Sequence, residues 1–174
     1  MKIMMTSNAE WAGDPGHPSH NDYLLELGRA TYAAAGLAGI AFDVLRIHGG
    51  VDSAELYSDP LGTLQGRLKN NLPPLDGIDE FLVLLDEARK MRNDLAHSLP
   101  VKHGLHRRTT KDLYYVRNFY TVESLREART LFEKARRKGS QVLYSDGGEA
   151  IKRWYSAPRS QALISLCRTL PPCR

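Results

Sequence analysis

The chain has 174 residues, 42% of them hydrophobic and 25% charged, which is the size and composition expected of one globular domain with its own core. Residues 1–20 lack the apolar stretch of a signal peptide, and the longest uncharged run, residues 30–42, is too short to cross a bilayer. The two cysteines, Cys167 and Cys173, are expected to be reduced thiols. We therefore expect a cytoplasmic protein that does not enter a membrane.

Charge is distributed unevenly along the chain, although the net charge is only +4. Residues 1–98 contain 8 Lys or Arg and 14 Asp or Glu, whereas residues 99–174 contain 16 and 6. A basic half of this kind is typical of proteins that bind an acidic partner, most often nucleic acid. The same distribution is expected where the acidic half pairs with the basic half within the fold or across a dimer, so both interpretations stay open.

The hydrophobic pattern predicts an all-α protein, a bundle of four to five helices. Helices are expected over residues 21–48, 59–70 and 76–97, after Thr121, and near residues 146–155. Residues 20–155 should form the bundle. Residues 1–19, which are rich in Gly and Pro, should be flexible, and residues 156–174 form a tail for which disorder is one outcome.

Several residues are predicted to begin or end these helices. Asn21 or Asp22 can cap the first helix, and Gly49 and Gly50 end it. The second should have Asp59 as its cap and Pro60 at its first helical position, and Thr121 should cap the fourth. Small residues at positions 33–36 and 39 permit close helix packing, in the core or at a dimer contact.

Residues 99–121, which follow the third predicted helix, form a basic insertion of a different character. Pro100 and Gly104 interrupt helical structure, and β-forming residues follow, so an irregular or hairpin-like connection is expected. Its cations could follow phosphates and its aromatic rings could stack on bases, and the residues favoured for RNA binding are Lys102, Arg107, Arg108 and Tyr114. The alternative is that the rings fold back over the bundle and the cations form a solvated face. His103 and His106 have no third ligand nearby, so we expect neither a metal site nor a cofactor.

The end of the third predicted helix carries an arginine, an asparagine and a histidine within six residues, Arg92, Asn93 and His97. Asn93 and His97 are four residues apart and share a helix face, and the long side chain of Arg92 can reach the same rim. Imidazole can transfer protons near neutral pH, and guanidinium binds phosphate oxygens. Because RNA carries its own 2′-hydroxyl nucleophile, this set could cleave RNA. The alternative is structural, with a paired arginine and a histidine that the helix dipole favours at the C-terminus.

The segment "ARKMRNDLAHSL" resembles the motif of the HEPN superfamily (higher eukaryotes and prokaryotes nucleotide-binding domain), in which an Arg and a polar residue precede a His near the end of a bundle helix. Arg92, Asn93 and His97 match that motif. The resemblance implies a metal-independent endoribonuclease that acts as a homodimer with a composite active site. It also implies a role in toxin–antitoxin or phage-defence systems, with a cognate antitoxin or nucleotidyltransferase as a conceivable partner. The competing hypothesis is a non-catalytic helical module that binds a partner protein or a nucleotide.

Overall fold

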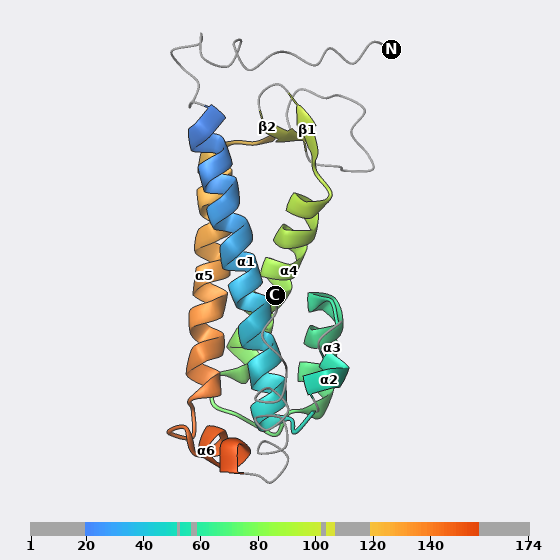
Figure 1. The fold of residues 1–174 in the computed structure, drawn as a ribbon, viewed down its shortest axis with the longest axis vertical. Coiled ribbons are helices and arrows are strands. Elements are labelled where there is room, and N and C mark those ends of the chain that lie inside the picture. The colour runs from blue at the N-terminus through green and yellow to red at the C-terminus, as the bar shows by residue number, and fades with distance from the viewer. Residues whose placement is uncertain (1–19, 52, 57–58, 102–103, 107–118, 157–174) are drawn as a thin grey trace, which may run out of the picture.

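The computed structural model describes residues 20–51, 53–56, 59–101, 104–106 and 119–156. In chain order the helices are α1 (His20–His48), α2 (Ser53–Leu56), α3 (Leu61–Asn71), α4 (Ile78–Ala96), α5 (Val122–Leu143) and α6 (Glu149–Ser156). They form a helical bundle in which α1 and α5 run side by side and α4 leans against them (Figure 1). The predicted all-α bundle is confirmed, with one short additional helix, α2. The predictions for residues 1–19 and most of the tail lie outside the described residues.

A small antiparallel sheet follows α4 at one end of the bundle (Figure 1). Its strands are β1 (Leu99–Val101), β2 (Gly104–His106) and β3 (Phe119–Tyr120), in the order β1-β2-β3. Leu99 pairs with His106 and Val101 with Gly104, which makes β1 and β2 a hairpin, and Leu105 pairs with Tyr120 across the next ladder. The hairpin-like insertion predicted from the sequence is therefore present among the described residues.

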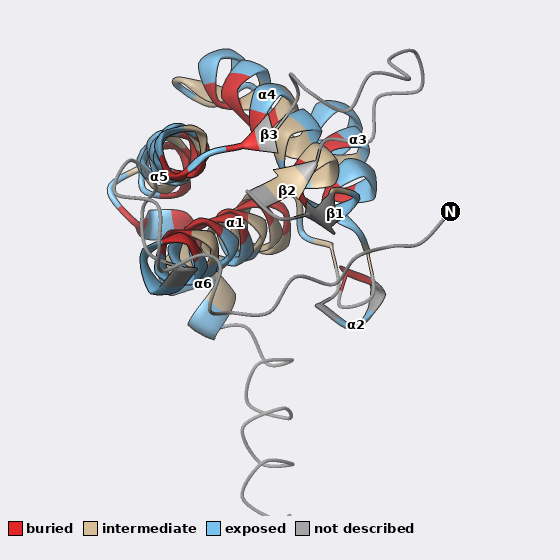
Figure 2. Cartoon of the chain, turned by 90° about the horizontal axis from the view of Figure 1, so that it is seen from above, coloured by how far each residue is buried: buried red, intermediate tan, exposed pale blue. Residues whose placement is uncertain are grey.

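The core lies between α1, α4 and α5, whose buried faces are turned toward one another (Figure 2). The largest fully buried side chains include Leu37 and Leu45 of α1, Phe81 of α4, and Phe132 of α5. Along each helix the buried residues recur at three- and four-residue steps, so each helix buries one stripe and leaves the opposite face to solvent. The core helices therefore form because their apolar period matches 3.6 residues per turn.

Helix α1 is the one described helix that is long and apolar enough to cross a membrane by length and composition. Its residues Leu37, Ala41, Val44 and Leu45 are completely buried in the bundle. Packing in the bundle thus accounts for part of this hydrophobicity, since 33% of its most apolar window is buried.

The helix ends follow the sequence at some positions and depart from it at others. Thr121 caps α5 as predicted: its hydroxyl accepts from the Ser124 N–H at 3.2 Å, and the Ser124 hydroxyl accepts from the Thr121 N–H at 2.6 Å. Helix α1 already begins at His20, so the prediction that Asn21 or Asp22 caps it was wrong. Both residues lie inside its first turn.

The predicted start of α3 was also wrong by one residue. Pro60 occupies the cap position itself, with an extended backbone (φ −66°, ψ 157°), and no side chain caps the helix. Asp59 instead places its Oδ2 2.9 Å from the Nε of Arg67, which lies in the second turn of α3. The ion pair competes for the carboxylate that the sequence pattern assigns to capping.

The three core helices approach one another closely at Gly139 of α5. A Cβ atom at this position would lie 2.5 Å from Cγ2 of Ile40 and 2.7 Å from Cε2 of Phe81. Gly139 therefore marks the point where α1, α4 and α5 meet without room for another carbon atom. In contrast, Gly66 of α3 is exposed and has no neighbouring atom within 4 Å of such a Cβ.

The same substitution at these two glycines should have opposite effects. Gly139→Ala should lower the free energy of unfolding by about 1–3 kcal/mol, because the added methyl overpacks the core. Gly66→Ala should raise it by about 0.4–1 kcal/mol, because alanine restricts the unfolded chain and favours the helix. Urea denaturation followed by circular dichroism measures both, and equal effects at the two sites would contradict this packing.

A polar cluster joins α3 to α4. The Asp86 carboxylate accepts from Gln65 at 3.2 Å and from Arg89 at 3.0 Å, and its Oδ2 lies 2.6 Å from the Nζ of Lys90. The Lys90 ammonium first, then Arg89 and Gln65, hold the pKa of Asp86 well below its usual range. Because the folded state favours the charged carboxylate, the cluster stabilises the fold at neutral pH.

This depressed pKa predicts an acid-sensitive contribution to stability. It is fully present above the ordinary Asp pKa of about 3.9 and is lost as the pH falls from there toward the lower pKa of the folded state. In urea titrations the native chain should therefore lose stability between about pH 4 and pH 2 more steeply than Asp86→Asn, whose side chain does not titrate. Parallel pH profiles for the two proteins would refute this role of Asp86.

Candidate active site

The candidate catalytic residues lie at the end of α4 that faces the small sheet (Figure 1). Arg92 and His97 are exposed, Asn93 is half-buried, and Leu95 holds the opposite side of the helix in the core. The Nη1 of Arg92 donates to the Oδ1 of Asn93 at 3.2 Å, and the backbone N–H of His97 donates to the Asn93 carbonyl at 3.0 Å. Asn93 thus contacts both other members of the motif, one through its side chain and one through its backbone.

His97 forms the C-cap of α4, with φ −97° and ψ 3°. Its imidazole makes no hydrogen bond or ion pair with any residue that the structure describes. His48, at the end of α1, differs, because its Nε2 lies 3.0 Å from the carbonyl oxygen of Leu143. Of these two helix-end histidines, His48 has a structural partner, whereas the imidazole of His97 is open to solvent.

A buried tyrosine fixes the backbone that carries the motif. Tyr120 is completely buried, and its hydroxyl donates to the Oδ2 of Asp94 at 2.8 Å and lies 3.2 Å from the sulfur of Met91. The Ser98 hydroxyl donates to the Asp94 carbonyl at 2.7 Å. Because Asp94 stands between Asn93 and His97 in the sequence, the bond from Tyr120 ties the motif to β3 and hence to the start of α5.

A second tyrosine anchors the hairpin to α1. The backbone N–H of Leu105 in β2 donates to the hydroxyl of Tyr23 at 2.8 Å, and Tyr23 is buried. Burial raises the pKa of Tyr23, and the N–H of Leu105 partly offsets this by stabilising the phenolate. The sheet is therefore held from both sides of the bundle, by Tyr23 of α1 and by Tyr120 of its own third strand. Neither contact was predicted from the sequence.

A pocket of about 550 Å³ opens between α1, the start of α3 and the end of α4. Arg92 lines it together with Leu95 and Ser98, and small residues of α1, Ala34, Ala35 and Ala38, form the facing wall. Neither Asn93 nor His97 lines this pocket. Within one chain the structure thus brings Arg92 to a pocket and leaves His97 outside it. The pocket was not predicted, because it depends on how three helices separated in sequence pack together.

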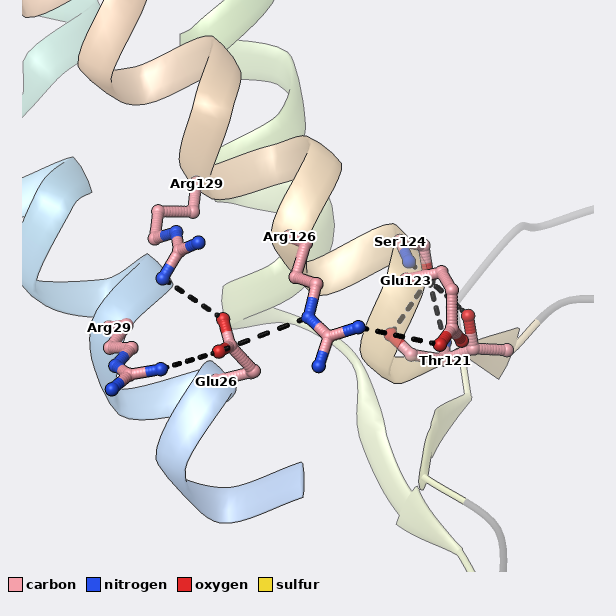
Figure 3. A network of polar contacts seen from close by, with 7 residues as sticks. All are labelled: Glu26, Arg29, Thr121, Glu123, Ser124, Arg126 and Arg129. Carbon is pink, nitrogen blue, oxygen red and sulfur yellow. Dashed lines mark hydrogen bonds and ion pairs between the residues drawn. The ribbon is translucent and has the colours of Figure 1, made fainter. Parts of the chain in front are cut away.

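Three arginines surround a buried carboxylate where α1 meets α5 (Figure 3). Glu26 of α1 lies 2.7 Å from Arg29, 3.3 Å from Arg129 and 4.0 Å from Arg126, and only 6% of its side chain is exposed. Lys138 of α5 likewise pairs with Glu80 of α4. Acidic residues of the first half thus pair with basic residues of the second half within the fold, which accounts for part of the uneven charge distribution.

The remaining predicted site residues, Lys102, Arg107, Arg108 and Tyr114, lie outside the described residues, as does His103. In the part of the chain that the structure describes, no group of three or more His, Cys, Asp or Glu side chains is arranged to hold a metal ion.

No protein-family model matches the chain. No curated protein and no solved structure matches it significantly either.

The bond from Tyr120 to Asp94 should contribute measurably to stability. Tyr120→Phe removes the donor and leaves a half-buried carboxylate without it, so the free energy of unfolding should fall by about 1.5–3 kcal/mol. Tyr144→Phe is the matched control, because Tyr144 is 59% exposed and its change should stay within about 0.5 kcal/mol. Urea denaturation measures both, and equal small changes would show that the Tyr120 hydroxyl does not anchor the motif.

Proposed function

We propose that this protein is a metal-independent endoribonuclease that cleaves single-stranded RNA and acts as a homodimer, with Arg92, Asn93 and His97 at its active site. The observation that carries the proposal is the state of His97. Its imidazole is exposed at the end of α4 and has no partner among the described residues, while Tyr120 and Asp94 fix the backbone beneath it. A catalytic group needs a side chain that can reach a ligand and a backbone that is held rigidly, and His97 meets both conditions.

The chemistry requires a base, an acid and a cation near one phosphate. A base takes the proton of the 2′-hydroxyl, whose oxygen forms a bond to phosphorus while the bond from phosphorus to the 5′-oxygen breaks. An acid gives a proton to that leaving oxygen, and the products are a 2′,3′-cyclic phosphate and a 5′-hydroxyl. Arg92 offsets the charge that builds up on the phosphorane oxygens. Its bond to Asn93 limits the orientations of the guanidinium.

One histidine cannot be base and acid in the same step, which is the reason for proposing a dimer. A two-fold axis would bring a second His97 to the same phosphate, so that one imidazole accepts a proton while the other donates one. Arg92 and His97 are exposed on one chain, as such a composite site requires. A role in phage defence or as a toxin, restrained by a partner such as an antitoxin or nucleotidyltransferase, is part of the same proposal.

The purified chain should cleave single-stranded RNA in the presence of EDTA. His97→Ala and Arg92→Ala should each lower the rate at least about 100-fold, because each removes a group that acts in the transition state. End-group analysis should find the cyclic phosphate. His97→Arg is the decisive control: it keeps a positive charge at the C-terminus of α4, where a helix dipole favours one, but it cannot transfer protons at neutral pH.

His97→Arg should therefore keep the stability of the native chain and lose its activity. If instead His97→Ala and Arg92→Ala cleave RNA at the native rate, this mechanism is refuted.

A second candidate is a non-catalytic module that binds a partner protein or a nucleotide. The observation that favours it is the pocket beside Arg92, which His97 does not line. A chain that sediments as a monomer, binds a ligand through Arg92 and leaves RNA intact would support this function over the first.

A further inference from the structure

The pocket between α1, α3 and α4 has the size and the walls of a site for a flat ring. Its volume of about 550 Å³ lies in the usual range for small-molecule sites. The wall that α1 provides consists of Ala34, Ala35 and Ala38, whose short side chains leave the space open, and Leu95 of α4 faces them. An apolar slot of this kind suits a nucleobase better than a phosphate or a sugar.

The polar groups of the pocket are mostly hydrogen-bond acceptors. The Thr31 hydroxyl donates its hydrogen to the Leu27 carbonyl at 2.9 Å, and the Ser98 hydroxyl donates to the Asp94 carbonyl at 2.7 Å. Each hydroxyl has only one hydrogen, which is already used, so toward a ligand both oxygens can act only as hydrogen-bond acceptors. Asp59, the third polar group at the pocket, is a carboxylate held by Arg67 at 2.9 Å.

Arg92 is the one cationic side chain among the residues that line the pocket. Its guanidinium has five N–H donors and uses one on Asn93, so others can bind a phosphate. The pocket thus combines an acceptor-rich interior with a single phosphate-binding group. A ligand that matches both must carry a ring with N–H donors and a phosphate attached to it.

We propose that this pocket binds a guanine nucleotide unit, with the base in the slot between α1 and α4 and its phosphate on Arg92. Guanine presents two adjacent donors, N1–H and N2–H, which suit an interior whose acceptors are the Oδ1 of Asp59 and the hydroxyl oxygens of Thr31 and Ser98. The Oδ2 of Asp59 is buried beside Arg67 and is not offered to a ligand. Adenine and cytosine place a ring acceptor beside their amino group, and uracil places a carbonyl on each side of its single N–H, so each directs an acceptor at the carboxylate. The inference rests on the proposed function in one respect: in an RNA substrate it would direct cleavage to a phosphate next to a guanosine.

The first test measures nucleotide binding without any cleavage. Isothermal titration calorimetry of the full chain with GMP, AMP, CMP and UMP should give the highest affinity for GMP, by about tenfold or more. Asp59→Asn should remove that preference. Arg67→Gln is the matched control, because it breaks the same ion pair but keeps the carboxylate, so its preference for GMP should remain.

A second pair of variants locates the binding. Ala35→Leu fills the slot from an exposed position of α1 and should weaken GMP binding about tenfold or more. Tyr32→Leu, three residues away on the same helix, lines a different groove and should leave it unchanged. Circular dichroism checks that all variants are folded. Binding that is equal for the four nucleotides, or that survives Ala35→Leu, would overturn the proposal.

An RNA arm separates this inference from the proposed function. Oligonucleotides that contain a single guanosine should bind to the cleavage-deficient His97→Ala chain more tightly than those without one, and the native chain should cut them beside that guanosine. Selective GMP binding by a chain that leaves RNA intact would support the pocket and refute the nuclease. Cleavage with no base preference, together with no selective GMP binding, would refute the pocket and leave the nuclease standing.

Discussion

The placement of Asn93 and His97 at the end of α4 depends on the hydrogen bond from the buried Tyr120 hydroxyl to the Asp94 carboxylate, 2.8 Å long. Asp94 lies within the last turn of α4, and Tyr120 lies at the end of β3, directly before the cap of α5. The bond therefore joins the two ends of an insertion of more than twenty residues at the point where the motif stands. It fixes Asn93 and His97 through the backbone and leaves their side chains free to meet a ligand.

Charge has two roles in this structure. The acidic first half and the basic second half meet between helices, where Glu26 of α1 is surrounded by arginines of α1 and α5 (Figure 3). A buried carboxylate that lost these partners would be costly, so the pairs fix how α1 and α5 align. Arg92 differs from these arginines, because its hydrogen bond is with the neutral Asn93, so its positive charge is available to an anion.

Arg92 connects the motif at the end of α4 with the pocket between α1, α3 and α4. It belongs to the motif that ends α4, and it lines the pocket that α1 and α3 complete. A phosphate bound there would lie beside an apolar slot, while His97 ends the same helix outside the pocket. In both proposals Arg92 binds a phosphate. The nuclease proposal adds cleavage of the phosphodiester, and the guanine proposal adds binding of the neighbouring base in the pocket.

The sequence by itself determined the local features: four helices and the final short one, the capping of α5 by Thr121, the hairpin-like insertion after α4, and the helix-end placement of Arg92, Asn93 and His97. These follow from periodicity, turn residues and caps, which act over a few neighbouring residues. Only the tertiary structure decided that Asp59 pairs with Arg67 rather than capping α3, that Tyr120 and Tyr23 anchor the sheet, and that Arg92 faces a pocket while His97 does not. Each of these contacts joins residues that come together only when the helices pack. Sequence patterns describe residues that are close along the chain, so they do not predict such contacts.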